Sequence, residues 1–293
     1  LNKKGSNETE GYIKLMEGMM AERPLSHEAT WYNDDPSFQE SVNETLRLKR
    51  EVLNVPTLEA RKLEGDAVAQ LLGETIATKS KVLEVPETLF VMMKQLRTLN
   101  IDGFGGIEHL PKSIGELASL HTLHLRECES LLELPEATFG KLLNLQTLNL
   151  TSCKSLGVLT PEIGKLINLI WLDLSFCEKL KALPTEIGKL SRLDSFKLQK
   201  CTGVTELPAS IGKLQSLRIL NMYGCSTLIQ LPEPIGELQN LEELNLRSCG
   251  GLTTLPNGFG ERLPNLTSLD LSMCKILSAI PDTLGQCAAL ETL

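Results

Sequence analysis

The sequence has few aromatic residues, which make up 4% of the chain although 42% of its 293 residues are hydrophobic. A core without large rings has to be filled by aliphatic side chains, and leucine recurs along most of this sequence. Short, similar layers need uniform side chains of this kind. The shortage of aromatic residues therefore favours a repetitive, leucine-rich interior.

Positive charge is also scarce, because 29 Lys and Arg stand against 37 Asp and Glu, which gives a formal net charge of −8. Proteins that bind nucleic acid or anionic membranes usually present a broad basic surface. No apolar run approaches the roughly 18 residues that cross a bilayer, and no charged-then-apolar leader opens the chain. We therefore expect protein partners, with no nucleic acid and no membrane span.

The sequence lacks the common catalytic and metal-binding motifs. It contains no GxxxxGK(S/T) phosphate loop, no HExxH and no serine-centred nucleophile elbow. Pairs of cysteines a few residues apart, which are typical of zinc sites, are missing as well. His121 and His124 are three residues apart on an expected strand, where their side chains point to opposite faces. We expect no enzyme, no metal and no cofactor.

A repeat with a period of 24 or 25 residues fills most of the chain. Counted from the first leucine of LxxLxL, its copies begin at Leu96, Leu120, Leu145, Leu169, Leu193, Leu217, Leu241, Leu266 and Leu290. Positions 1, 4 and 6 of a copy are apolar, and alternation at 4 and 6 is typical of a short strand with one buried face. The closing IGxL predicts a single helical or 3-10 turn. Each copy should add one strand to a parallel sheet.

Two irregularities should distort the turns on the outer side. The copies beginning at Leu120 and Leu241 have 25 residues, with the extra residue after Pro135 and Pro256. Thr160 stands where other copies have proline, and a proline follows it directly. We expect slightly irregular turns at these places and an unbroken stack.

The period is absent before residue 82, which divides the chain into two predicted regions. Residues 1–81 form a helical N-terminal region that caps the array, with a methionine-rich amphipathic stripe within residues 12–20. An alternative is that this stripe docks on a partner. Residues 82–293 contain a half repeat, eight full repeats and the start of a ninth. Because the chain begins with Leu1 and stops within a copy, we expect a fragment of a longer protein.

Cysteine occupies position 9 in seven consecutive copies: Cys128, Cys153, Cys177, Cys201, Cys225, Cys249 and Cys274. In a parallel stack these side chains point the same way, whereas a disulfide needs converging Cβ atoms. The thiols are therefore expected to be buried weak donors toward turn carbonyls. Reduced thiols favour the cytoplasm or nucleus, with an organelle as an open alternative. Cys287 lies outside this series and has no predicted role.

The pattern LxxLxLxxCxxLxxLPxxIGxL resembles the leucine-rich repeat family over residues 82–293. The LPxxIGxL ending is most similar to the intracellular subclasses of plant disease-resistance receptors and Ras-binding-type plant leucine-rich repeats. The resemblance implies an α/β fold, a right-handed solenoid with a parallel sheet on its concave side and an N-terminal helical cap. It does not imply one function, because members of this family bind unrelated partners.

Positions 3, 5, 7 and 8 are predicted to vary freely on the concave side. The copies between Leu169 and Leu246 carry the largest groups there, and Trp, Tyr and Arg are frequent energetic anchors of interfaces. An open alternative is ordinary variation on a tolerant surface. The predicted partner-binding residues are Trp171, Asp173, Phe176, Lys197, Lys200, Tyr223 and Arg247.

These observations favour a non-catalytic protein-protein interaction module that binds a partner on its concave face. One alternative is a structural subunit of a larger complex, anchored by the N-terminal helices. Another is the ligand-sensing region of a larger immune-type receptor. The sequence does not identify the partner.

Overall fold

The computed structural model describes residues 90–91 and 93–293. The predicted helical cap in residues 1–81 and the half repeat at residues 82–86 lie outside the described residues. The division of the chain at residue 82 therefore stays a prediction, and the account below concerns the repeats.

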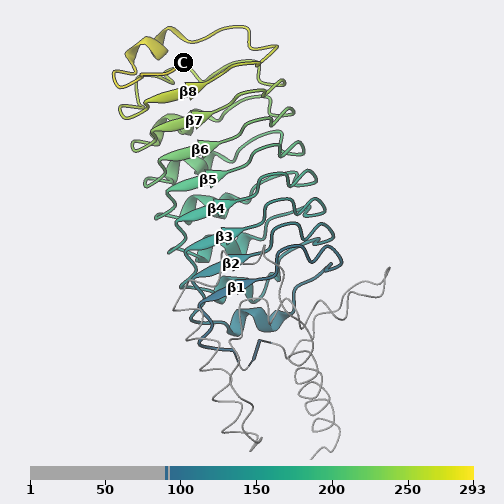
Figure 1. Ribbon diagram of the computed structural model, residues 1–293. Helices are drawn as coiled ribbons and strands as arrows, with labels where there is room; N and C mark the ends of the chain where they lie inside the picture. Colours follow the sequence, from purple (N-terminus) through teal and green to yellow (C-terminus); the bar gives the residue numbers. More distant parts are fainter. Residues whose placement is uncertain (1–89, 92) are drawn as a thin grey trace, which may run out of the picture. The chain divides into compact units, whose positions relative to one another are not determined.

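The described repeats form one parallel sheet of eight strands that pair in chain order (Figure 1). Neighbouring strands are in register, so Leu99 pairs with Leu123 and Leu148 pairs with Leu172. This arrangement confirms the prediction of one strand per copy. The strands are β1 (Thr98–Asn100), β2 (Thr122–His124), β3 (Thr147–Asn149), β4 (Trp171–Asp173), β5 (Ser195–Lys197), β6 (Ile219–Asn221), β7 (Glu243–Asn245) and β8 (Ser268–Asp270).

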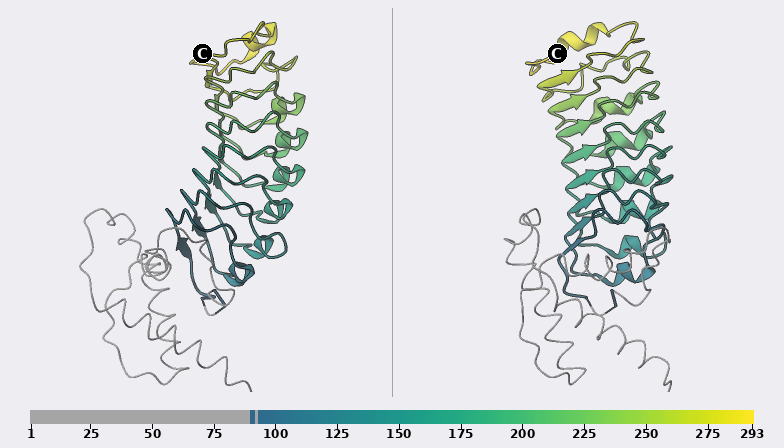
Figure 2. Two further views of the ribbon diagram at one scale, coloured as in Figure 1. Left: turned by 90° about the vertical axis from the view of Figure 1, so that its right-hand side faces the viewer. Right: turned by 45° about the vertical axis from the view of Figure 1, so that its right-hand side comes forward.

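Short 3-10 helices return the chain along the opposite, convex side, while the strands line the inner side of the bend (Figure 2). Most begin directly after a proline with extended backbone, such as Pro184 at φ −67° and ψ 150° before η5. The 3-10 helices are η2 (Lys112–Glu116), η3 (Phe139–Lys141), η4 (Pro161–Lys165), η5 (Thr185–Lys189), η6 (Ala209–Lys213), η7 (Glu233–Glu237) and η8 (Asp282–Gln286).

The two 25-residue copies have the expected irregular turns. In the first, η3 has three residues instead of the five of its neighbours. In the second, residues 257–262 form turns without a 3-10 helix. At the third irregular place, the Thr160 hydroxyl accepts the Glu162 N–H at 3.2 Å, and Pro161 takes the first position of η4. A threonine cap thus replaces the usual proline.

The core consists of the repeated apolar positions. Leu169, Leu172, Leu174 and Cys177, which stand at positions 1, 4, 6 and 9 of one copy, have no exposed surface. Most 3-10 helices cover their layer on the convex side with a buried isoleucine or leucine, as Ile187 does in η5, whereas the two 25-residue copies bury Phe139 and Phe259 there. In the part of the chain that the structure describes, no helix is long and apolar enough to cross a membrane.

Candidate interaction surface

The position-9 thiols form hydrogen bonds with the preceding copy. The Sγ of Cys201 donates to the Leu174 carbonyl at 3.0 Å, and the Sγ of Cys225 donates to the Leu198 carbonyl at 3.0 Å. Burial raises the pKa of both thiols to about 12, so they stay protonated at neutral pH and can donate. The same bond to position 6 of the preceding copy recurs at all seven cysteines. The predicted buried donors are confirmed at six positions, and Cys274 makes the same bond while partly exposed. We call these seven residues the cysteine ladder.

Cys287 occupies the place that leucine holds in the other 3-10 turns. It is the C-terminal cap residue of η8, as Leu190 is of η5. It is 7% exposed, and its Sγ lies 3.6 Å from the Gly260 carbonyl oxygen. Residues 284–287 read LGQC, so Cys287 stands at the last leucine of IGxL and its core position could have been predicted from the sequence. Among the described residues, no group of three or more His, Cys, Asp or Glu could hold a metal ion.

Position 5 proves more constrained than predicted, because its side chain organises the turn after the strand. The Asp173 carboxylate accepts the Ser175 N–H at 2.8 Å and the side chain is only 8% exposed. Asn or Asp accepts the N–H two residues on in six copies, from Asn100, Asn149, Asp173, Asn221, Asn245 and Asp270. Asp173 therefore has a structural role that its predicted place on the binding surface did not include.

A second series of hydrogen bonds between copies, which the sequence analysis missed, is made by the residue directly before the first leucine in five copies: Asn144, Asn168, Ser216, Asn240 and Asn265. The Asn168 side chain donates to the Leu143 carbonyl at 2.9 Å, and Asn240 donates to the Gln215 carbonyl at 2.7 Å. The available signal was the recurrence of Asn or Ser at this place. These residues join adjacent copies, as the cysteines do.

Position 8 holds the backbone in the left-handed region. Gly103 and Gly224 are suited to it, but Glu127, Ser152, Phe176, Lys200, Ser248 and Met273 also adopt positive φ. The Phe176 N–H donates to the Gln199 carbonyl at 2.7 Å, which holds this conformation in place. A left-handed L-residue costs about 1–2 kcal/mol, and a bulky one is unusual. Strain of this kind often accompanies functional surfaces.

Trp171 in β4 and Lys197 in β5 form the first of two lysine–aromatic contacts. The Lys197 Nζ lies 5.4 Å from the centroid of the indole ring, within the range of a cation–π interaction. Both side chains are partly exposed. We call this pair the strand cluster.

The second contact lies just beyond the strand ends. The Lys200 Nζ is 5.4 Å from the Phe176 ring centroid and 5.9 Å from the Tyr223 ring centroid. Gly224 leaves room for this lysine, because a Cβ there would come within 3.0 Å of the Lys200 Cγ. We call Phe176, Lys200 and Tyr223 the rim cluster.

Five of the seven predicted partner-binding residues therefore meet in two clusters, on the copies beginning at Leu169, Leu193 and Leu217. We call these five residues the central patch. Arg247 is exposed one copy further on and makes none of the ring contacts described above. Its backbone carbonyl accepts the Gly224 N–H at 2.8 Å.

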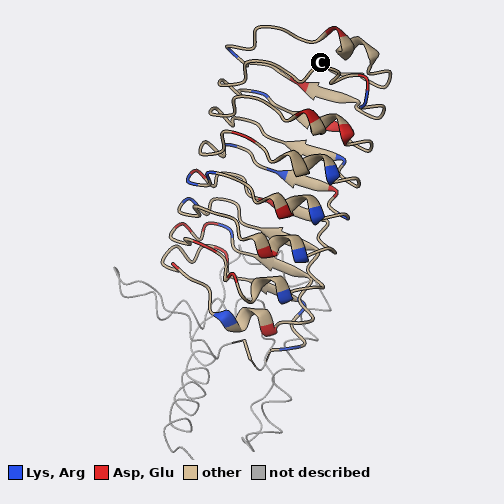
Figure 3. Cartoon of the chain, turned by 180° about the vertical axis from the view of Figure 1, so that it is seen from behind, with Lys and Arg blue, Asp and Glu red and all other residues tan. Residues whose placement is uncertain are grey.

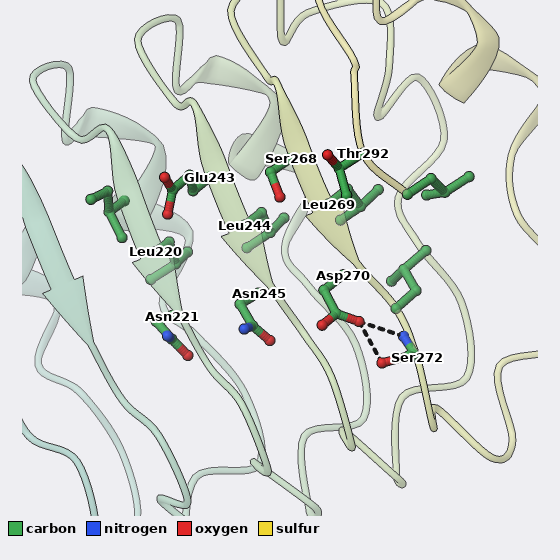
Figure 4. Close-up of a pocket in the computed structure, with 13 residues that line it drawn as sticks. Leu220, Asn221, Glu243, Leu244, Asn245, Ser268, Leu269, Asp270, Ser272 and Thr292 are labelled. Atoms are coloured by element: carbon green, nitrogen blue, oxygen red, sulfur yellow. Dashed lines mark hydrogen bonds between the residues drawn. The ribbon is translucent and has the colours of Figure 1, made fainter.

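The concave side of β6–β8 is hollowed by a pocket of about 460 Å³. Figure 4 shows Glu243 and Ser268 in one row across it, and Asn245 and Asp270 in a second row. The Asp270 carboxylate accepts the N–H and hydroxyl of Ser272 at 2.9 and 2.6 Å. This end of the concave side is polar and acidic. The sequence placed these residues on the concave side but gave no reason to single them out.

Charges elsewhere on the repeats are mixed and partly paired. Figure 3 shows both signs on the convex 3-10 helices. Beside the strands, Arg218 lies 2.7 Å from Glu242 and 3.7 Å from Asp194. Within the described residues, Lys197 and Lys200 have no carboxylate at ion-pair distance. The central patch therefore presents two ammonium groups whose neighbours are aromatic rings.

The comparisons with known proteins agree with this architecture. Residues 144–271 match the family described as leucine-rich repeat region, and residues 265–287 match the family described as leucine-rich repeat. No curated protein matches the chain. Neither matching family is described as catalytic.

Solved leucine-rich repeat structures are also similar. The leucine-rich repeat domain of the type III effector XopL is 25% identical, with a TM-score of 0.51 over 96% of this chain and 94% of that chain. The ectodomain of the Arabidopsis thaliana receptor kinase GASSHO1/SCHENGEN3 is 24% identical over 72% of this chain and 28% of that chain, with a TM-score of 0.43. A Leptospira interrogans leucine-rich repeat protein is 24% identical over 96% and 86% of the two chains, with a TM-score of 0.32.

Proposed function

Because this chain carries a leucine-rich repeat region, we propose that it is a non-catalytic interaction module that binds a partner protein on its concave face. Leucine-rich repeat domains generally serve as protein-interaction modules. The observation that carries the proposal is the central patch, in which Trp171, Phe176 and Tyr223 lie with two lysines on three consecutive copies.

The composition and conformation of the central patch support this assignment. Partly exposed Trp and Tyr side chains provide large contact areas, and they are enriched among energetic anchors. Phe176 keeps an aromatic side chain at φ 63°, where Gly224 in a later copy meets the same backbone requirement with less strain. Arg247 extends the proposed surface at its margin. Asp173 contributes by holding the turn between Trp171 and Phe176.

We also propose that the protein belongs to the intracellular subclass resembling plant disease-resistance receptor and Ras-binding-type repeats, and that it works in the cytoplasm or nucleus. The eight free thiols of the described residues support a reducing compartment. Asn149 begins an Asn-x-Thr triplet, but its side chain is 8% exposed and accepts the Thr151 N–H and hydroxyl at 3.0 and 2.7 Å. A glycan on Asn149 would disrupt this turn.

The two other functions depend on parts outside the described residues. Anchoring in a large assembly would use the helices predicted within residues 1–81, which cap the repeats in our proposed division of the chain. A ligand-sensing region of an immune-type receptor would require further domains. The central patch favours the interaction module because it is built entirely within the described repeats.

The test is a quantitative pull-down with the full 293-residue chain and the variant Trp171→Ala/Tyr223→Ala. Truncating anchor residues of an interface commonly costs 2 kcal/mol or more, so we expect at least one partner to be recovered about tenfold less. The matched control is Leu143→Ala/Ile167→Ala, which removes two side chains that are 53% and 52% exposed outside the central patch. Undiminished recovery by the first variant, or equal loss by both, would contradict the proposal.

A further inference from the structure

We infer that the central patch receives a short acidic segment of the partner protein, rich in Asp or Glu. This inference rests on the proposed function and names the chemistry of what is bound. It starts from the two ammonium groups of Lys197 and Lys200, which lie over aromatic rings at 5.4 Å and have no carboxylate at ion-pair distance among the described residues.

Three other lysines of the repeats are paired with carboxylates within the chain. Lys154 lies 2.7 Å from Glu129, Lys165 lies 2.8 Å from Glu162, and Lys141 lies 3.6 Å from Glu116. The two lysines of the central patch are held instead by the faces of Trp171, Phe176 and Tyr223. A ring leaves the charge of an ammonium group in place and leaves its remaining N–H donors available for a carboxylate.

The rings and the neighbouring backbone also restrict where the lysines can be. Lys200 lies between Phe176 and Tyr223, and Gly224 provides the space along its stem. A flexible lysine normally loses side-chain freedom when it forms an ion pair. Restriction before binding reduces that loss, so these two lysines are better prepared to bind carboxylates than lysines free in solvent.

The surrounding charge limits the length and kind of the acidic ligand. The net charge of −8 and the small number of concave cations oppose a nucleic acid backbone or an anionic membrane. Glu243 and Asp270 line the hollow at β6–β8 and repel an acidic chain that continues that way. We therefore infer that acidic residues cross β4–β6, and that neutral or basic residues of the same segment follow over β7–β8.

The experiment selects short random peptides displayed on phage against the full chain and measures the affinity of enriched peptides by fluorescence anisotropy. We expect the enriched sequences to contain an excess of Asp and Glu. The variant Lys197→Gln/Lys200→Gln should weaken their binding about tenfold, since each ion pair contributes a modest amount. The charge-matched control Lys189→Gln/Lys213→Gln removes two exposed lysines from η5 and η6 and should change binding by less than about twofold.

Enriched peptides without an acidic excess, or an equal effect of the two lysine variants, would overturn the inference. The variant Trp171→Ala/Tyr223→Ala separates this failure from failure of the proposed function. If it weakens non-acidic peptides while Lys197→Gln/Lys200→Gln leaves them unchanged, the concave face binds peptides of another chemistry. If no peptide is enriched, or if neither variant weakens the peptides that are, both the acidic segment and the proposed function are contradicted.

Discussion

Replacing Cys201 with alanine should destabilise the repeats by about 2 kcal/mol. The Cys201 side chain has no exposed surface, and its Sγ donates to the Leu174 carbonyl at 3.0 Å. Losing the buried sulfur costs about 1–1.5 kcal/mol through lost burial and the cavity that remains. Losing a weak thiol donor costs about 0.5–1 kcal/mol more. Urea unfolding followed by circular dichroism measures the sum as a change in the unfolding free energy.

Cys274→Ala is the matched control for this prediction. Cys274 makes the same bond, to the Leu246 carbonyl at 3.1 Å, but its side chain is partly exposed in the last complete copy. Less burial is lost there, so the destabilisation should be about half as large. If Cys201→Ala changed the unfolding free energy by less than about 0.5 kcal/mol, the cysteine ladder would not stabilise the stack. Equal losses at both positions would contradict the argument from burial.

Three further predictions test other parts of the fold. Burial raises the pKa of Cys128, Cys201, Cys225 and Cys249 to about 12. Above about pH 8.5 these thiols ionise in the unfolded chain but not in the folded one, so the unfolding free energy should fall toward pH 12 by up to about 1.4 kcal/mol per thiol and pH unit. An unchanged urea midpoint between pH 8 and pH 10 would contradict this prediction. Gly164→Ala places a Cβ 2.6 Å from the Glu186 carbonyl oxygen and should cost about 1–3 kcal/mol, whereas Gly157→Ala meets no atom within 4 Å and should be nearly neutral in the same urea titration. Asp173→Ala leaves the Ser175 N–H without its acceptor and should cost about 1–3 kcal/mol, and Asp173→Asn should recover most of that loss in thermal unfolding.

The stack could be predicted from the sequence because identical layers repeat the same physical requirements. Leucines at positions 1, 4 and 6 are buried in copy after copy, and the parallel register follows from the constant period. The buried state of the cysteines was predictable for the same reason. Their acceptors in the preceding copy were not, because the acceptor depends on how adjacent layers are offset in space.

The candidate site was predictable in composition but not in geometry. Large residues at variable positions pointed to Trp171, Phe176 and Tyr223, yet the stacking of Lys200 between two rings depends on side-chain directions in three copies. The positive φ at position 8 was hidden because only Gly103 and Gly224 carry glycine there among the eight copies. The structural role of Asp173 was not predictable, because its hydrogen bond with the Ser175 N–H depends on a turn geometry that the sequence pattern does not specify.

The most direct test of concave-face binding is site-specific photo-crosslinking of the full chain in cell extract. A benzophenone side chain replaces Ile219, which lies in β6 on the concave side, or Ile167, which is 52% exposed outside the central patch. The account predicts a covalent adduct with a partner protein from position 219 that disappears in the Trp171→Ala/Tyr223→Ala background, and no such adduct from position 167. Adducts from position 167 alone would contradict it.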